Sequence, residues 1–158
     1  MATQERFADY FGFTETEVDK LFNRYTESTD TPAITREGLK LWYDGYHTAS
    51  GKKIYNPRSV VVALSNNQLA NYWTSSGPYD EIFFYIRKNI ADVCSDLALM
   101  LAGESISAKV QEYAAASMNL QTKDEIFSAM VVYGFLNSEN GKVFIPNKEL
   151  MATISNVL

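Results

Sequence analysis

The sequence Trp42-Tyr43-Asp44-Gly45-Tyr46, followed by Tyr55-Asn56-Pro57-Arg58-Ser59, combines aromatic residues with residues that shape the backbone. Gly45 accepts a positive φ after a helix, which bulkier residues resist. Asn56 can cap a helix, and Pro57 loses no hydrogen bond at a first helical position. Residues 42–59, named here the aromatic joint, are therefore predicted to set the angle between helices, with large aromatic side chains packed around them.

Helix signals lie on both sides of the aromatic joint. Thr14 is followed three residues later by Glu17, which is the pattern of a capping box. Thr35 opens a second helix that Asp44-Gly45 ends, and a small hairpin is predicted over 46–55. Asn66-Asn67 ends the helix that begins at Asn56-Pro57. These signals predict three helices and one hairpin before residue 68.

Residues 79–101 form the longest predicted element. Their apolar side chains recur at spacings of three and four, which is typical of one helical face. The residues of this stripe are Ile82, Ile86, Ile90, Val93, Leu97 and Met100. About 23 residues at 1.5 Å each predict a single helix of about 35 Å, ended by a C-terminal cap at Gly103.

Patterns in the last third of the chain predict a helix, then a hairpin, then a second helix. Thr122 and Glu125 form a second capping-box pattern, and Gly134 ends that helix. Residues 135–136 and 143–145 are predicted strands on either side of a turn that contains Asn140-Gly141. Asn147 is the predicted cap of the final helix.

The segment between the long helix and Thr122 remains ambiguous. Residues 106–111 alternate between apolar and polar side chains, which favours a strand, whereas Ala114 to Ala116 favour a helix. Taken together, the patterns predict a mainly α fold with short β-hairpins. We expect a helical, lid-like lobe over 1–103, with its small hairpin at 46–55, and a winged-helix-like lobe over 104–158.

Composition bears on partners and location. The net charge of −5 disfavours binding to phosphate backbones, and residues 104–158 carry four Lys and no Arg against six Asp or Glu. Cys94 is the only cysteine, so an internal disulfide is excluded. The N-terminus lacks the apolar core of a signal peptide, and no apolar run approaches the ~20 residues of a membrane span. An intracellular protein is expected.

The familiar catalytic and metal motifs do not fit this sequence. Between Gly45 and Gly51 lie five residues instead of the four of a phosphate-binding loop, and Lys53 stands where that loop needs Ser or Thr. His47 is the only histidine, and His47 with Cys94 falls short of the ligand set of a zinc site. We therefore assign no catalytic, cofactor-binding or metal-binding residue.

Two other interpretations of the aromatic joint stay open. The first is a stacking platform for bases, with Lys40, Lys52, Lys53 and Arg58 nearby to contact phosphates. The six aromatic residues of this stacking platform would be Trp42, Tyr43, Tyr46, Tyr55, Tyr72 and Trp73. The second is an enzyme with a polar pocket at Tyr43, Asp44, His47 and Asn56.

The aromatic joint and several other blocks resemble the C-terminal part of the AAA-ATPase-like domain family, whose members often carry a restriction-endonuclease-like nuclease domain downstream. The more specific blocks are Trp42-Tyr43-Asp44-Gly45-Tyr46, Ile54-Tyr55-Asn56-Pro57, Ser59-Val60 and Tyr72-Trp73. Weaker blocks are Phe11-Gly12-Phe13-Thr14 with Glu17-Val18, Tyr133-Gly134-Phe135-Leu136 and Ile145-Pro146-Asn147-Lys148-Glu149. Arg58 departs from the family, which more often has an aromatic residue there.

The resemblance implies a role without catalysis. In that family the phosphate-binding loop and the acidic magnesium-site residues lie upstream, and the nuclease motif lies downstream of the part that this chain resembles. The expected function is a lid or regulatory module that binds a protein partner or the ATPase and nuclease domains. Self-association could also cover apolar surface. Nucleic-acid binding by a winged-helix module and an enzyme at the aromatic joint are the alternatives.

Overall fold

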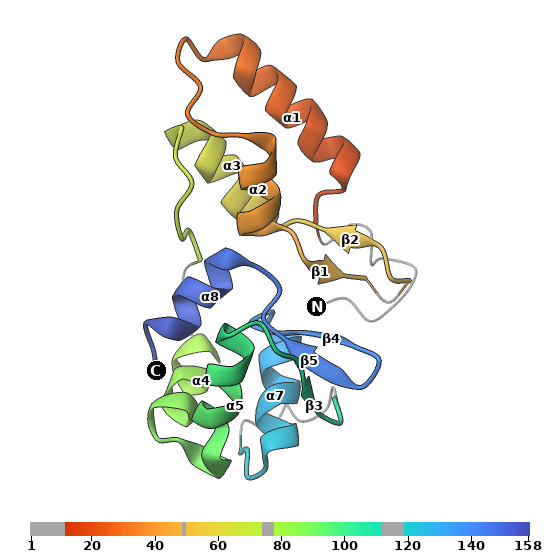
Figure 1. Cartoon of the computed structure of the whole chain (residues 1–158), viewed down its shortest axis with the longest axis vertical. Helices are drawn as coiled ribbons and strands as arrows, with labels where there is room; N and C mark the ends of the chain where they lie inside the picture. The colour runs from red at the N-terminus through yellow and green to blue at the C-terminus, as the bar shows by residue number, and fades with distance from the viewer. Residues whose placement is uncertain (1–11, 49, 74–77, 112–118) are drawn as a thin grey trace. The chain divides into compact units, whose positions relative to one another are not determined.

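The computed structural model describes residues 12–48, 50–73, 78–111 and 119–158 (Figure 1). Their contacts divide the chain into two compact units. The N-terminal unit contains the described residues up to Trp73 together with Asn147–Glu149. The C-terminal unit contains the described residues of 74–146 and 150–158. The second unit therefore includes residue 103, where the sequence predicts the end of the first lobe.

The helices of the N-terminal unit begin where the sequence predicts. Thr14 accepts a hydrogen bond from the Glu17 N–H, and the Glu17 carboxylate accepts one from the Thr14 N–H at 2.8 Å, so the capping box is confirmed. Thr35 accepts from the Gly38 N–H at 3.0 Å. The side chain of Asn56 accepts from the N–H groups of Arg58 and Ser59. The elements are α1 (Glu15–Ser28), α2 (Arg36–Tyr43), β1 (Tyr46–His47), β2 (Lys53–Ile54) and α3 (Pro57–Asn66).

The predicted hairpin at 46–55 is confirmed, and the chain before α1 extends it. Tyr46 pairs with Ile54 in antiparallel register, and Phe13 forms a bridge with Tyr55. Gly12 permits this approach, because a Cβ at Gly12 would lie 2.8 Å from the Tyr55 carbonyl oxygen. The core of the unit is made by apolar residues from all three helices, from the segment before α2 and from the position after β2: Val18, Tyr25, Ile34, Leu39, Tyr43, Tyr55, Val60 and Ala63.

The C-terminal unit packs helices against a small sheet. Its sheet is antiparallel in the order β3-β5-β4, so the last strand lies between the other two. The Thr122 capping box is confirmed, and α4 packs against α7. The elements are α4 (Pro78–Arg87), η2 (Ile90–Asp92), α5 (Val93–Leu101), β3 (Ile106–Ser107), α7 (Lys123–Val132), β4 (Asn137–Glu139), β5 (Lys142–Phe144) and α8 (Lys148–Ser155), whose first two residues belong to the N-terminal unit.

The predicted hairpin turn at Asn140-Gly141 is confirmed, and both residues have the positive φ of a type I′ turn (51° and 73°). Its first strand begins later than predicted. Residues 135–136 come shortly after α7, which ends at Val132, and their N–H groups donate to the Met130 carbonyl, so pairing starts only at Asn137.

The prediction of one helix over 79–101 is wrong. α4 ends at Arg87, and α5 begins at Val93 after a short 3-10 turn. Asn89, Ala91 and Asp92 have φ values of 49°, 53° and 56°, which are incompatible with a continuous right-handed helix. The predicted stripe is nevertheless buried, apart from the half-buried Ile90, because α4 and α5 both turn their apolar faces to the core of the unit.

The fold is mainly α with short antiparallel hairpins, as the sequence predicts. Gly103, with φ of 97°, ends α5 as expected. The helical pattern at Ala114 to Ala116 and the loop at 74–77 lie outside the described residues. Within the part of the chain that the structure describes, no helix has both the length and the apolarity of a membrane span.

Candidate functional site: the aromatic joint

Tyr43 ends α2 and anchors the aromatic joint from inside the core. Its side chain is fully buried, and its hydroxyl donates to the Ala70 carbonyl at 2.8 Å and accepts from the Ala70 N–H at 3.1 Å. Burial raises the pKa of Tyr43 to about 12, although the bond to Ala70 opposes the rise. The phenol is therefore protonated at neutral pH, and its two hydrogen bonds to Ala70 hold the segment after α3.

The turn after Tyr43 closes on the start of α3. Gly45 has a φ of 102°, which confirms the predicted left-handed backbone at this position. The Tyr43 carbonyl accepts a hydrogen bond from the Asn56 N–H at 3.1 Å. Asp44 is 6% exposed, and its carboxylate Oδ1 has no hydrogen-bond partner among the described residues. The turn is thus held mainly by backbone contacts.

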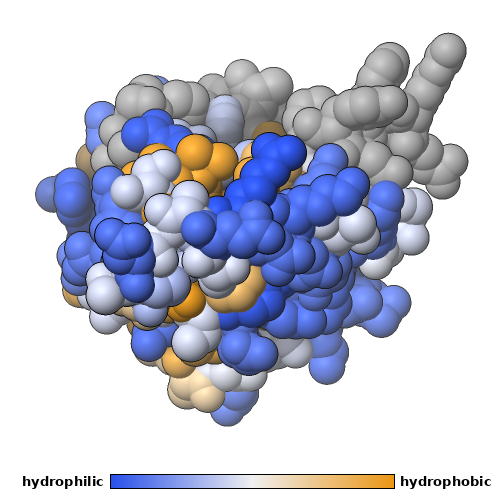
Figure 2. Space-filling model, turned by 90° about the horizontal axis from the view of Figure 1, so that it is seen from above, coloured by the Kyte–Doolittle hydropathy of each residue, from blue (hydrophilic) through white to orange (hydrophobic). Residues whose placement is uncertain are grey.

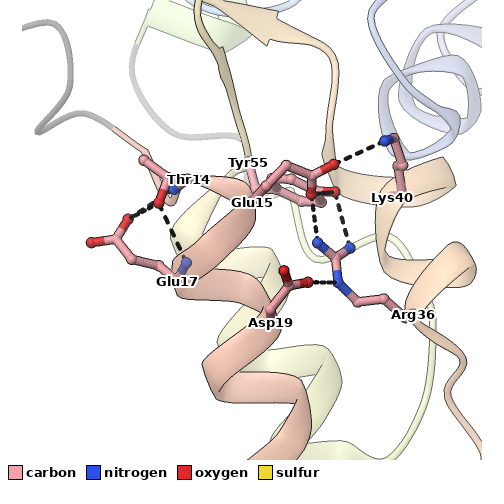
Figure 3. A network of polar contacts seen from close by, with 7 residues as sticks. All are labelled: Thr14, Glu15, Glu17, Asp19, Arg36, Lys40 and Tyr55. Atoms are coloured by element: carbon pink, nitrogen blue, oxygen red, sulfur yellow. Dashed lines mark hydrogen bonds and ion pairs between the residues drawn. The ribbon is translucent and has the colours of Figure 1, made fainter.

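Tyr55 connects the hairpin to α1 and α2 through a set of charged residues (Figure 3). Its buried hydroxyl donates to Glu15 Oε2 at 2.5 Å and accepts from Arg36 at 3.0 Å. The Arg36 guanidinium also binds Glu15 at 2.5 Å and lies 5.3 Å from the centre of the Tyr55 ring. We name this set the Arg36 cluster: Glu15, Asp19, Arg36, Lys40 and Tyr55.

The charges of the Arg36 cluster compensate one another. Partial burial alone would raise the pKa of Glu15, but hydrogen bonds from Lys40, Tyr55 and Arg36 outweigh it and lower that pKa to about 2. Burial and the carboxylate of Glu15 raise the pKa of Tyr55. Two carboxylates and two cations are paired within the cluster. It has no excess of positive charge with which to hold a phosphate.

A second polar set joins the aromatic joint to the start of α8. The buried Ser59 hydroxyl lies 2.8 and 2.9 Å from the two carboxylate oxygens of Glu149 and donates to them. The backbone N–H of Tyr72 donates to the same carboxylate at 2.8 Å, and the N–H of Trp73 also donates. We name this set the Glu149 cluster: Ser59, Tyr72, Trp73 and Glu149.

Glu149 lies in a different electrostatic environment from Glu15. Its side chain is fully buried, and the groups that donate to it in this cluster are neutral. Burial raises the pKa of Glu149, and the bonds from Ser59, Tyr72 and Trp73 offset only part of the rise. The carboxyl group is therefore a buried acceptor that gathers three donors from two separate segments.

The residues beside Glu149 also contact the aromatic joint. The side-chain amide of Asn147 donates to the Asp44 carbonyl at 2.9 Å. The Lys148 ammonium lies 5.0 Å from the centre of the Trp42 ring, which is a cation–π contact. Residues 147–149 thus complete the N-terminal unit although more than 70 residues separate them from Trp73.

The structure divides the predicted site residues into four groups. Tyr43, Asp44, Ser59, Tyr72 and Trp73 surround residues 147–149 or the Ala70 segment, whereas Tyr55 belongs to the Arg36 cluster. Gly45, Asn56 and Pro57 shape the backbone. Tyr46 is buried at 3% exposure, and Trp42 is half-buried.

Of the charged residues of the two clusters, the sequence singles out Lys40 alone, as a possible phosphate contact, and it marks no acidic residue as part of a site. An acidic residue in the first turn of a helix is common, so the sequence around Glu15 does not mark it as part of a site. No local pattern marks Arg36 either. Glu149 stands in a block that carries the family resemblance, and that is the signal that could have pointed to it. Across the described ranges, no three His, Cys, Asp or Glu residues converge as a metal site would require.

Comparisons with known proteins give one partial match. A stretch of 77 residues, 49% of the chain, is 27% identical to an uncharacterized protein in the vnfD 5′ region of Azotobacter chroococcum mcd 1. The match spans 14% of that protein's length. No family model matches the chain, and no solved structure matches it. The relationship to AAA-ATPase-like proteins therefore remains a proposal.

Proposed function

We propose that the chain is a non-catalytic lid or regulatory module that binds another protein domain, as the resemblance to AAA-ATPase-like proteins implies. The observation that carries the proposal is the use of the aromatic joint inside the fold. The Tyr43 hydroxyl binds Ala70, the Ser59 hydroxyl binds Glu149, and the Asn56 side chain caps α3. Because these groups are hydrogen-bonded within the fold, they make the module rigid. A rigid lid can transmit the conformational state of a neighbouring domain.

The two alternative functions have less support at the aromatic joint. Tyr43, Tyr46 and Tyr55 are each at most 5% exposed, so their rings offer no free face to a base. An enzyme at this position would need an accessible polar group, whereas the Tyr43 hydroxyl is bound to the Ala70 backbone and has a raised pKa.

The C-terminal unit supports the same proposal. Its order of elements, with α7 followed by a hairpin whose second strand pairs with β3, is compatible with a winged-helix-like unit. Because residues 104–158 are acidic overall, we infer that this unit contacts protein in preference to nucleic acid. An intracellular location is part of the proposal.

The N-terminal unit offers a surface for such a partner. A shallow groove is lined by Leu21 and Tyr25 of α1 and by Val61 and Leu64 of α3. Val61 is 45% exposed, and Leu41 of α2 is 60% exposed. Figure 2 shows one face of the molecule, on which hydrophobic residues reach the surface in small patches bordered by hydrophilic ones. Apolar side chains in a groove are suited to a protein contact.

The experiment combines the chain with the separately expressed ATPase core of an AAA-ATPase-like protein. We expect the chain to bind the core and to change its rate of ATP hydrolysis. Val61→Glu should weaken this binding by about tenfold, because it places a charge in an apolar contact. Asn23→Glu, at an exposed position of α1 that does not line the groove, is the matched control for added charge.

Calorimetric titration with Mg-ATP and Mg-ADP separates the proposal from its rivals. The chain alone should give no heat and keep its melting temperature. Micromolar nucleotide binding by the chain alone would contradict the proposal and identify the aromatic joint as a nucleotide site. A salt-dependent mobility shift with DNA or RNA would instead favour the nucleic-acid alternative.

A further inference from the structure

The turn between α4 and α5 is held in an unfavourable backbone conformation. Within four residues, Asn89, Ala91 and Asp92 all have left-handed φ values, and none of them is glycine. Asparagine and aspartate tolerate this region better than other residues with a side chain. Ala91 has no polar side chain that could compensate, so it carries the clearest strain. We name residues 88–92 the hinge.

The sequence across the hinge also fits a continuous helix. Residues 79–102 contain neither glycine nor proline. The apolar stripe keeps its spacing of three and four from Ile86 through Ile90 to Val93. A straight α4–α5 helix would therefore keep the residues of the apolar stripe on one face and would remove the left-handed residues. The bent and straight forms are thus two alternative conformations of the same segment.

Side-chain contacts at the hinge favour the bent form. The Asn89 carbonyl oxygen Oδ1 accepts from the Cys94 N–H at 2.9 Å, and its amide donates to Asp92 Oδ1 at 3.1 Å. Tyr79 and Phe83 of α4 also pack edge-on against Phe135, which follows α7. Straightening would break these contacts within one chain and would uncover fully buried residues such as Ile82 and Ile86.

We propose that the chain forms a dimer by exchange about this hinge. Two straightened copies can each place α4 against α7 of the other copy. The contacts of α4 with α7 and Phe135 that are lost within one chain are then regained with the partner. The hydrogen bonds of the bent hinge are lost, while the strain at Asn89, Ala91 and Asp92 is released. The interface needs no new surface, because it is the contact that already exists within the monomer. Strained hinge loops favour this kind of exchange.

The proposal predicts opposite effects for two changes at the hinge. Ala91→Gly relieves the left-handed position and disfavours a helix, so it should lower the dimerisation constant about tenfold. Asn89→Ala/Asp92→Ala removes the hydrogen bonds of the bent form and favours a helix, so it should raise that constant about tenfold. Asn156→Ala, at an exposed position near the C-terminus that lacks a positive φ, should leave it unchanged.

The measurement is the molar mass of the chain by light scattering after equilibration over a range of concentrations. The proposal expects dimer at high concentration and the order of dimerisation just given. If both the natural sequence and Asn89→Ala/Asp92→Ala remain monomeric at every concentration, the proposal is wrong. Since Ala91→Gly should stabilise the bent monomer, a lower melting temperature for that variant would also overturn it.

A mixed disulfide tests the exchange itself. Tyr79 and Tyr133 lie on the two sides of the hinge in sequence, and their ring centres are 6.3 Å apart. One batch carries Tyr79→Cys and the other Tyr133→Cys, both with Cys94→Ser, and the two are mixed and equilibrated. Exchange predicts a disulfide-linked heterodimer, more of it when Asn89→Ala/Asp92→Ala is added to both batches. The chain that carries both Tyr79→Cys and Tyr133→Cys shows whether this disulfide forms within the monomer. If it forms there but the mixed dimer gives no such disulfide, the dimer is associated without exchange, and the proposal would fail.

Discussion

The two polar clusters of the N-terminal unit use the same residue type in opposite ways. In the Arg36 cluster, Glu15 is partly exposed, receives two cations and has a pKa lowered to about 2. In the Glu149 cluster, the carboxyl group is fully buried, receives neutral donors and has a raised pKa. The first cluster joins elements that are near in sequence, whereas the second recruits a residue 90 positions beyond Ser59. Because Glu149 is fully buried and Glu15 is partly exposed, we expect the free energy of unfolding to depend more on the Glu149 cluster than on the Arg36 cluster.

The largest expected effect is the loss of the Glu149 carboxyl group. Glu149→Ala leaves the Ser59 hydroxyl and the N–H groups of Tyr72 and Trp73 buried without their acceptor. The free energy of unfolding, measured in urea, should fall by about 3 kcal/mol. Glu139→Ala, at an exposed position of β4, is the control and should change it little. If Glu149→Ala and Glu139→Ala lowered the free energy of unfolding by the same amount, the buried carboxyl group would contribute no more to stability than the exposed one, contrary to this prediction.

Removal of Arg36 should have a smaller effect. Its guanidinium contacts Glu15, Asp19 and Tyr55 while its side chain remains 21% exposed. Arg36→Ala should lower the free energy of unfolding by about 1.5 kcal/mol, because water replaces part of what is lost. Arg24→Ala, on the exposed side of α1, is the matched control. If Arg36→Ala cost more than Glu149→Ala, the ranking of the clusters would be reversed.

The dependence of stability on pH should have opposite signs in the two clusters. Because the pKa of Glu15 is lowered from 4.5 to about 2, its contribution is present above pH 4.5 and is lost as pH falls toward 2. The pKa of Glu149 is raised from 4.5, so the folded protein binds the proton more tightly. Stability from this residue should therefore fall as pH rises above 4.5, by at most about 1.4 kcal/mol per pH unit.

Urea unfolding between pH 2 and pH 8 measures both contributions. Glu15→Gln should flatten the profile on its acid side, and Glu149→Gln should flatten it above pH 4.5. The same change of slope in both variants would show that the two carboxyl groups share one kind of environment, contrary to the contacts described above.

The smallest expected effect is at the rim of the Arg36 cluster. Asp19 binds the Arg36 Nε at 2.7 Å, but its side chain is 58% exposed. Asp19→Asn should therefore lower the free energy of unfolding by no more than about 0.5 kcal/mol, and salt should diminish the difference. Glu27→Gln, at an exposed position of α1, controls for the change in net charge because it also removes one negative charge. A cost that persists in 1 M salt would show that this pair is better shielded from water than its exposure indicates.

Local signals made much of the fold predictable. The caps at Thr14, Asn56 and Thr122 act within four residues, so the sequence shows both partners together. The Asn140-Gly141 turn is predictable for the same reason, because both residues accept a positive φ. The mainly α class follows from these signals.

Tertiary packing decided the features that the sequence could not show. The bend at Asn89 has no glycine or proline to mark it, and it forms because α4 and α5 each pack their apolar face within the C-terminal unit. The Glu149 cluster depends on a contact across 90 residues, which no local pattern encodes. The sequence predicts the aromatic joint as a structural element, but its partners in the Arg36 cluster and the buried Glu149 come from segments that no local pattern connects to it.

A double-mutant cycle between Ser59 and Glu149 tests most directly whether residues 147–149 complete the aromatic joint. The free energies of unfolding of Ser59→Ala, Glu149→Ala and the double variant are compared with that of the natural sequence in urea, because alanine at either position removes the hydrogen bond. Direct contact between the hydroxyl and the carboxyl group predicts a coupling energy of about 1–2 kcal/mol, with the double variant losing less than the sum of the single losses. Additive losses, with a coupling energy near zero, would contradict the contact and leave the segment 147–149 without a role in the joint.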